Sequence, residues 1–237
     1  MFNPENPPEI SASRWINSKD PRALKAEKGK VVVVCVFQML CPGSQKYGLP
    51  QAMRLAEAFS EDEVTVLGLH MAFENFDKQS PDKVEAYLAE NDITIPVAYD
   101  KPNGDGLPQT MQDYELQGTP AILIFDRQGR LRRHYLGAVD DLRVGAEVMA
   151  MCIEETSSPR ELSVALERKL HAALVDPNTH EHAGGCCGGG HHHHDHDHAH
   201  AGGCCGGGHD HSHEHGHCDD HGKKEGCDGH GGCGCKH

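Results

Sequence analysis

Runs of apolar and polar positions divide the chain into alternating short strands and helices. Residues 31–37, VVVVCVF, are apolar without alternation, which is typical of a strand covered on both faces. Residues 44–59 repeat apolar side chains at helical spacing and contain Pro50, which should kink this helix or mark its first turn. The same reading predicts strands at 11–16, 63–70 and 93–100, a hairpin at 118–137, and helices at 80–92, 107–115, 140–155 and 157–174.

This order of elements predicts an α/β fold, in which a central mixed sheet carries helices on both faces. Ser80 and Asp140 each precede a helical pattern, and both are residue types favoured as N-caps. All large apolar residues lie in residues 1–176, which is enough for one domain of ordinary size.

The last part of the chain has a different composition. Residues 180–237 contain 17 of the 20 His, 8 of the 11 Cys and 17 of the 27 Gly, but no Leu, Ile, Val, Phe, Met, Trp or Tyr. Such a segment cannot bury enough apolar area to offset its ordering entropy. We therefore expect a domain over 1–156, an additional helix within 157–176, and a disordered tail over 177–237.

The net charge limits the possible partners of the chain, and the N-terminal residues indicate its location. The formal net charge is -14, and an acidic chain without basic clusters is poorly suited to nucleic acid or anionic membranes. Residues 1–10, MFNPENPPEI, lack the basic and apolar regions of a secretory signal, and the apolar run at 31–37 is too short to span a bilayer. These features favour the cytoplasm, where cysteines are reduced and serve metal or redox chemistry more often than structural disulfides.

Cys41 stands where a buried strand should end and a helix should begin. Unpaired N–H groups and the helix dipole at such a position stabilise a thiolate and lower the pKa of the thiol. The alternative is a free cysteine that only packs near the end of the strand. Cys35 and Cys152 lie among apolar residues and are expected in the core. Counted along the extended strand, Cys35 lies about 20 Å from Cys41, beyond disulfide reach.

About eighty residues downstream, Thr119-Pro120 directly precedes the apolar strand of the hairpin, where a proline is tolerated. Together with GKVVVVCVFQMLCPG, GLPQA, VLGLH, GDGLPQTM and GTPAILIFDRQGRLR, it makes residues 10–155 resemble the redoxins. These are thioredoxin-like proteins similar to TlpA, alkyl hydroperoxide reductase and thiol-specific antioxidant proteins. The resemblance implies a thioredoxin-like fold, with Cys41 as the attacking thiol and Pro120 as a cis-proline facing it. It also implies that the Thr119 backbone pairs with a substrate.

Ser44 departs from the Cys-x-x-Cys pattern common in that family, and so leaves dithiol chemistry without its second thiol. Peroxiredoxins place a Thr three residues before the reactive Cys, whereas this chain has Gln38 there and no preceding Pro. Thiol–disulfide exchange at Cys41, with Ser44, Thr119 and Pro120 beside it, is therefore preferred over peroxide reduction. The expected partner is a thiol or disulfide protein, or a low-molecular-weight thiol. His70 and His134 are interpreted as structural.

The tail contains an internal repeat, because AGGCCGGGH at 183–191 recurs at 201–209. Imidazole and thiolate ligands on Gly-rich spacers suit zinc, nickel and copper. The CC pairs, alternating His and terminal GGCGC also resemble the C-terminal tail of SlyD, an FKBP-type prolyl isomerase and nickel metallochaperone, which implies Ni²⁺ first and Zn²⁺ second. The candidate ligands are His180, His182, Cys186, Cys187, His191, His192, His193, His194, His196, His198, His200, Cys204, Cys205, His209, His211, His213, His215, His217, Cys218, His221, Cys227, His230, Cys233, Cys235 and His237.

Two functions of different classes follow. The first is a thiol oxidoreductase that uses one active-site cysteine and carries a metal-binding tail, whose thiols could resolve what Cys41 forms. The second is a metal buffer or metallochaperone whose thioredoxin-like body is inactive. The reactivity of Cys41 toward alkylating agents separates them.

Overall fold

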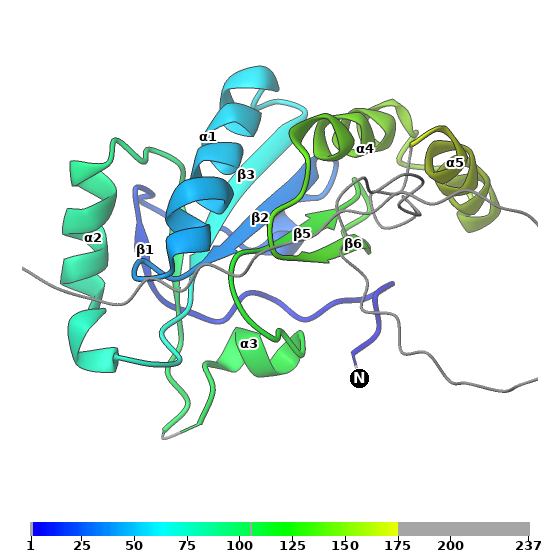
Figure 1. The fold of residues 1–237 in the computed structure, drawn as a ribbon. Helices are drawn as coiled ribbons and strands as arrows, with labels where there is room; N and C mark the ends of the chain where they lie inside the picture. The colour runs from blue at the N-terminus through cyan, green and yellow to red at the C-terminus, as the bar shows by residue number, and fades with distance from the viewer. Residues whose placement is uncertain (1, 105, 175–237) are drawn as a thin grey trace, which may run out of the picture. The chain divides into compact units, whose positions relative to one another are not determined.

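The computed structural model describes residues 2–104 and 106–174. Its centre is a six-stranded mixed sheet in the order β1-β4-β3-β2-β5-β6 (Figure 1). β2 pairs in parallel with β3 and antiparallel with β5, β3 pairs in parallel with β4, and the outer strands β1 and β6 pair antiparallel with β4 and β5. The strands are β1 (Ala12–Ile16), β2 (Val31–Phe37), β3 (Val64–His70), β4 (Val97–Asp100), β5 (Ala121–Phe125) and β6 (Leu131–Leu136).

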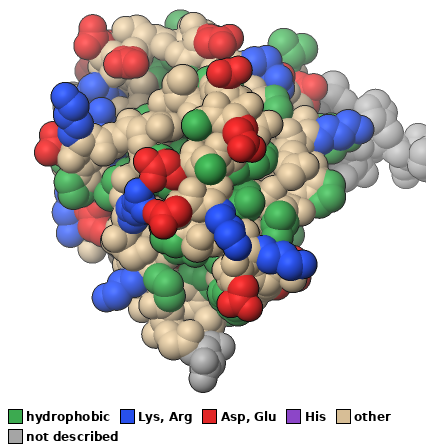
Figure 2. Space-filling view, turned by 90° about the vertical axis from the view of Figure 1, so that its left-hand side faces the viewer, with side chains coloured by type: hydrophobic (Ala, Val, Ile, Leu, Met, Phe, Trp, Pro, Cys, Tyr) green, Lys and Arg blue, Asp and Glu red, His purple; other side chains and the backbone are tan. Residues whose placement is uncertain are grey.

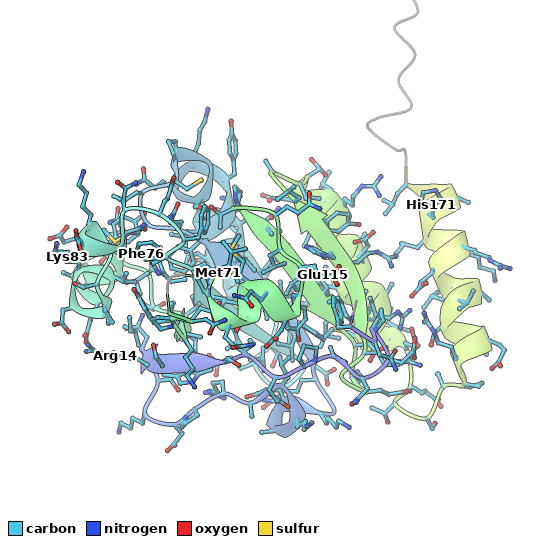
Figure 3. All side chains as sticks on the ribbon, turned by 90° about the horizontal axis from the view of Figure 1, so that it is seen from below. Arg14, Met71, Phe76, Lys83, Glu115 and His171 are labelled. Atoms are coloured by element: carbon cyan, nitrogen blue, oxygen red, sulfur yellow. The ribbon has the colours of Figure 1, made fainter. Side chains whose placement is uncertain are left out.

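Helices cover both faces of this sheet, so the predicted α/β fold is confirmed (Figure 1). One face packs against α1, α2 and α4, which contribute Leu49, Val84 and Val148 to a common apolar cluster. The other face packs against α3 and the N-terminal segment, whose Met111 and Phe2 lie in a second cluster, and Figure 3 shows this side from below. The helices are α1 (Leu49–Ala58), α2 (Pro81–Glu90), α3 (Gln109–Asp113), α4 (Asp141–Ile153) and α5 (Arg160–Ala173).

The sheet explains why β2 has no polar position. Every residue of β2 is buried, because the strand has a neighbour on each side and a layer of helix or coil on each face. Its side chains alternate between the two apolar clusters, with Val33 and Cys35 in one and Val32 and Val34 in the other. The end of β2 is thereby fixed, and the loop that follows starts from a rigid position.

Three predicted elements differ in detail. The strand predicted at 93–100 forms only over Val97–Asp100, and the helix predicted at 107–115 only over Gln109–Asp113. The helix predicted from Ser44 begins with a π-helical turn, η2 (Ser44–Gly48), before α1 starts. Pro50 has no N–H to donate to a carbonyl of the preceding turn, and the widened turn accommodates this loss.

Caps and connections agree partly with the sequence pattern. The Asp140 side chain accepts hydrogen bonds from the Leu142 and Arg143 amides and caps α4 as predicted. Ser80 occupies the N-cap position of α2, but its side chain makes no capping hydrogen bond. Pro81 at the first position of α2 removes one of the N–H groups that would need a partner.

Charged side chains attach α5 beside β6. Ser163 is the one fully buried residue that α5 contributes to the described structure. Arg132 of β6 pairs with Asp126, Glu154 and Glu167, at distances of 2.9 and 3.1 Å to the first two. We call this set the arginine cluster; its remaining members are Arg130 and Ser163. The helix predicted within 157–176 is thus present, and it is held mainly by ion pairs.

Candidate active site

Cys41 lies in the turn between β2 and η2. Its amide donates to the Gln38 carbonyl at 3.0 Å, and its carbonyl accepts from the Gln45 amide at 3.1 Å. The first bond closes the turn after the strand, and the second begins the helical segment. The thiol is partly exposed, at the position where sequence analysis expected a reactive cysteine.

The Thr119–Pro120 segment lies beside this thiol. The Thr119–Pro120 peptide bond is cis, as the resemblance implied. The Cys41 thiol donates a hydrogen bond to the Thr119 carbonyl, with Sγ 3.4 Å from the oxygen. The Pro120 carbonyl in turn accepts from the Gly137 amide at 2.7 Å, which fixes the segment before β5 to the end of β6.

Ser44 is the fourth member of the site, and it is fully buried. Its Oγ accepts a hydrogen bond from the Gln38 amide at 3.3 Å. The hydroxyl proton is then available for the Cys41 sulfur, and Ser44 is the largest of the contributions that favour the thiolate. Cys41, Ser44, Thr119 and Pro120 are therefore gathered at one place in the structure.

These neighbours set the pKa of Cys41. Partial burial raises the pKa, but hydrogen bonds from the Ser44 and Thr119 side chains and from the Ser44 and Gly43 backbone lower it, and the net result is a pKa below the ordinary value of a thiol. Because the thiolate is the nucleophile in exchange chemistry, this environment favours reaction at neutral pH.

The other thiols of the described residues have a different environment. Cys35 is buried, and burial raises its pKa to about 12. Cys152 is half-buried on α4, where burial also raises its pKa. Both are free in the structure, and both pack in or against the apolar core as predicted. Neither thiol is suited to act as the second thiol that Ser44 does not supply.

Cys35 and Cys41 lie closer together than the distance predicted by counting residues along an extended strand. A Cβ added at Gly48 would lie 3.4 Å from the Cys35 sulfur and 2.9 Å from the Pro120 Cβ. A Cβ added at Gly43 would lie 3.7 Å from the Cys41 sulfur and 3.0 Å from the Pro120 Cδ. The helical segment folds back over β2, so both sulfurs lie near Pro120, closer than the extended distance of about 20 Å.

Gly48 is a residue of the site that sequence analysis missed. It allows the helical segment to approach Pro120 without a side chain between them. A glycine inside a helical pattern costs stability, and when it is present it often serves close packing. Gly48 in KYGLP is such a glycine within a helical pattern. The sequence does not show what it packs against, because Pro120 lies about seventy positions away.

Exposed apolar side chains lie on the segments that carry the site. Leu40 precedes Cys41, Tyr47 projects from η2, and both are exposed. Leu136, at the end of β6, is also exposed, and its Cδ1 would lie 3.9 Å from a Cβ added at Gly118. Leu136 therefore lies beside the segment that carries Thr119. The surroundings of Cys41 offer apolar contacts to a polypeptide chain, which small peroxides do not need.

The predicted metal ligands, His180 to His237, lie outside the described residues. Within 2–104 and 106–174, no group of three or more His, Cys, Asp or Glu side chains could hold a metal ion. The metal-binding tail thus stays a prediction from the sequence, as do its disorder and the domain boundaries.

Comparisons with known proteins were made for the whole chain. A scan against protein-family models and a search of curated proteins found no match. Solved structures do match. A thioredoxin-like superfamily protein is 41% identical with a TM-score of 0.61, and the match covers 62% of this chain and 96% of that one. The chain belongs to the thioredoxin-like superfamily.

One further structure supports this assignment, and another supports the fold alone. A thiol-disulfide isomerase from Corynebacterium glutamicum is 38% identical with a TM-score of 0.62, over 64% of this chain and 98% of that one. A thioredoxin-like protein in its oxidised form is 22% identical with a TM-score of 0.50, which shows the fold. The predicted thioredoxin-like body is confirmed.

The resemblance of the tail to SlyD and the predicted cytoplasmic location stay predictions. No described helix of this thioredoxin-like protein is long and apolar enough to cross a membrane.

Proposed function

We propose that this thioredoxin-like protein exchanges thiols and disulfides through a single thiolate, Cys41. The observation that carries the proposal is the hydrogen-bonded environment of Cys41, where Ser44 and Thr119 lower the pKa of a partly exposed thiol. The relative from Corynebacterium glutamicum, named a thiol-disulfide isomerase, supports the same chemistry.

The reaction has two steps. The Cys41 thiolate attacks one sulfur of a disulfide R–S–S–R′, forms the mixed disulfide Cys41–S–S–R and releases the thiolate of R′. A second thiolate then attacks the sulfur of R, forms a new disulfide and releases the Cys41 thiolate. During attack, Ser44 donates to the Cys41 sulfur, and the Thr119 backbone pairs with the incoming polypeptide.

Ser44 determines where the second thiolate comes from. A serine cannot resolve the mixed disulfide, and the two other thiols of the described body have raised pKa values. The second thiolate is then a cysteine of the substrate polypeptide or a low-molecular-weight thiol. When it belongs to the substrate, the net reaction is a rearrangement of disulfides, which consumes neither oxidant nor reductant.

The test compares the full chain with its Cys41→Ser and Cys35→Ser variants. The assay follows rearrangement of a scrambled disulfide protein in a buffer with a small thiol. All three chains keep the tail cysteines, so a loss of activity confined to Cys41→Ser assigns the exchange to Cys41. Equal activity of wild type and Cys41→Ser would show that the body is inactive, and would favour the alternative of a metal buffer.

We propose separately that residues 180–237 bind Ni²⁺ or Zn²⁺. The repeated AGGCCGGGH unit and the alternating His that follow each copy support this proposal, because they supply imidazole and thiolate ligands on Gly-rich spacers. Metal stoichiometry should be measured on the full chain and on a chain ending at residue 176. Equal metal content in both chains would contradict binding by the tail.

A further inference from the structure

Helix α4 is apolar on its exposed face as well as on its buried face. Val144, Val148 and Met151 point into the core. On the opposite side, Leu142, Met149 and Ile153 are 83%, 51% and 70% exposed. These three recur at helical spacing and fall on one stripe of the helix. The charged residues of α4 lie off this stripe, so the helix presents a second apolar face to solvent.

The residues between the three exposed side chains are small. Gly145 and Ala146 lie on the same side of the helix, and a Cβ added at Gly145 would meet no atom within 4 Å. No charged side chain falls on the stripe itself. By contrast, Lys, Arg, Asp and Glu are scattered over the face of the molecule on the α2 side (Figure 2). The stripe thus differs from that face, where charged side chains separate the hydrophobic ones.

The stripe continues onto α5. Ile153 lines a hollow together with Leu162 and Leu166 of α5, and Leu162 is 56% exposed. From these exposed fractions, Leu142, Met149, Ile153 and Leu162 offer roughly 500 Å² per chain. Two copies that cover them fully would bury roughly 1,000 Å², which is the lower bound for a specific interface. We define these four residues with Gly145 and Ala146 as the α4 stripe.

We propose that the α4 stripe is the interface of a homodimer, in which α4 packs antiparallel against α4 of a second copy. In this arrangement Leu142 meets Ile153 of the other copy, and Ala146 meets Met149. Large side chains face each other at the ends of the contact, and a large one faces a small one near the middle. The stripe is therefore complementary to itself under a two-fold axis, as an isologous interface requires.

Other occupants fit the stripe less well. Residues 180–237 contain no large apolar side chain that could cover it. An anionic membrane would need flanking basic residues, whereas the chain is strongly acidic. Antiparallel packing also aligns the two helix dipoles favourably.

The experiment measures the association of the full chain by sedimentation, from low micromolar to several hundred micromolar, with a chelator and a reductant so that tail metals or disulfides cannot link copies. Wild type is expected to be a dimer. Met149→Glu would bury an unpaired charge twice in the interface and should weaken association by about a hundredfold or more. Leu107→Glu, at an exposed position outside the stripe, is the matched control and should associate like wild type.

A charge pair tests the antiparallel register. Leu142→Lys and Ile153→Glu should each weaken association, and the double variant should recover much of it, because each introduced lysine would face an introduced glutamate of the other copy. Circular dichroism should show that every variant keeps its fold, since the substituted side chains are exposed. A monomeric wild type, a dimer that Met149→Glu leaves intact, or a double variant weaker than both single variants would overturn the proposal.

Discussion

Gly48 and Pro120 approach so closely that a Cβ at residue 48 would lie 2.9 Å from the Pro120 Cβ. The same Cβ would lie 3.4 Å from the Cys35 sulfur. Both neighbours are held rigidly, one by a proline ring and the other by the central strand β2. The helical segment after Cys41 is thus seated directly on the residue that faces the thiol.

Gly48→Ala should destabilise the protein. Alanine normally favours a helix over glycine by about 1 kcal/mol, but overpacking against Pro120 and Cys35 costs about 1–3 kcal/mol. We expect a net loss in the free energy of unfolding, measured in denaturant. The control is Gly145→Ala, where the added Cβ meets no atom within 4 Å. In protein dilute enough that the α4 stripe is unpaired, this control should keep or raise stability. A Gly48→Ala chain more stable than wild type would contradict the close approach.

Ser44→Ala should raise the pKa of Cys41. The variant removes the hydroxyl that contributes most to the thiolate's stability. In wild type, the alkylation rate of Cys41 should rise with pH around a midpoint below that of an ordinary thiol, and in the variant this midpoint should move upward. Mass spectrometry of the peptide containing Cys41 measures the rate separately from the tail cysteines.

The same variant should also change how the free energy of unfolding depends on pH. A pKa lowered by folding contributes stability above the unfolded pKa and loses it as pH falls through the folded pKa. Ser44→Ala should therefore lower the free energy of unfolding more at alkaline pH than at pH 6. A difference that is the same at both pH values would indicate a packing effect of Ser44 alone.

Ser44→Cys should restore a dithiol. Because the Ser44 side chain hydrogen-bonds the Cys41 sulfur, a cysteine there lies within reach of a disulfide. Mild oxidation should link residues 41 and 44, and peptide mapping should find this bond in the variant. The variant should also release a reduced substrate without a second thiolate from the substrate or from a small thiol, which wild type requires. Absence of the 41–44 bond in folded, oxidised variant would contradict the geometry of the site.

His70 should make the protein sensitive to mild acid. The ring is fully buried between Phe37 and Tyr99, and neither ring nitrogen has a protein partner of normal hydrogen-bond geometry among the described residues. Burial lowers the pKa of His70 to about 4, although the nearby Gln79 side chain favours the protonated form of the ring. As pH falls from 6.5 to 4, the unfolded chain binds a proton that the folded chain does not, so stability falls by on the order of 3 kcal/mol.

His70→Phe should remove this loss. The variant keeps an aromatic ring and shares every other histidine with wild type, so the difference between the two chains isolates His70. Its free energy of unfolding should equal or exceed that of wild type at pH 7, and should exceed it by more at pH 5. A gap between the two chains that does not widen with acid would show that His70 is protonated when folded.

Arg132→Met should be much more damaging than Arg14→Met. Both arginines pair with two or more carboxylates, but the Arg132 side chain is 2% exposed and the Arg14 side chain is 40% exposed. Removing one partner of a buried set leaves unpaired charges and costs about 3–5 kcal/mol, whereas exposed pairs contribute about 1 kcal/mol or less. Denaturant unfolding of the two variants measures the contrast.

The sequence predicted the elements whose signals are local. The uninterrupted apolar run of β2, the Asp140 cap and the turn between β5 and β6 all lie within a few residues of their causes. Cys41 and Thr119-Pro120 could be joined only through the family resemblance, because about eighty residues separate them. Their contact through the Thr119 carbonyl depends on the pairing of β2 with β5, which periodicity does not report.

Features built from distant polar partners could not be predicted. Asp100 accepts hydrogen bonds from the Thr110 amide and hydroxyl and from the Met111 amide, and so fixes the start of α3. In the sequence it is only the last residue of a strand. The members of the arginine cluster likewise occupy polar positions of a hairpin and a helix, and the sequence does not indicate that they pair with one another. The α4 stripe was hidden for another reason, because apolar periodicity does not tell which face of a helix is covered.

The two outermost strands are poor templates for edge-to-edge aggregation. β1 has an irregular register between Ala12 and Arg14, and a bulge with a charged residue hinders the addition of another strand. On β6, the charged Arg133 is partly exposed, and the amide of Leu131 already donates to the Pro4 carbonyl. Growth of a fibril by addition of strands to either edge is therefore disfavoured. This holds even in concentrated protein, where the α4 stripes of two copies would pair.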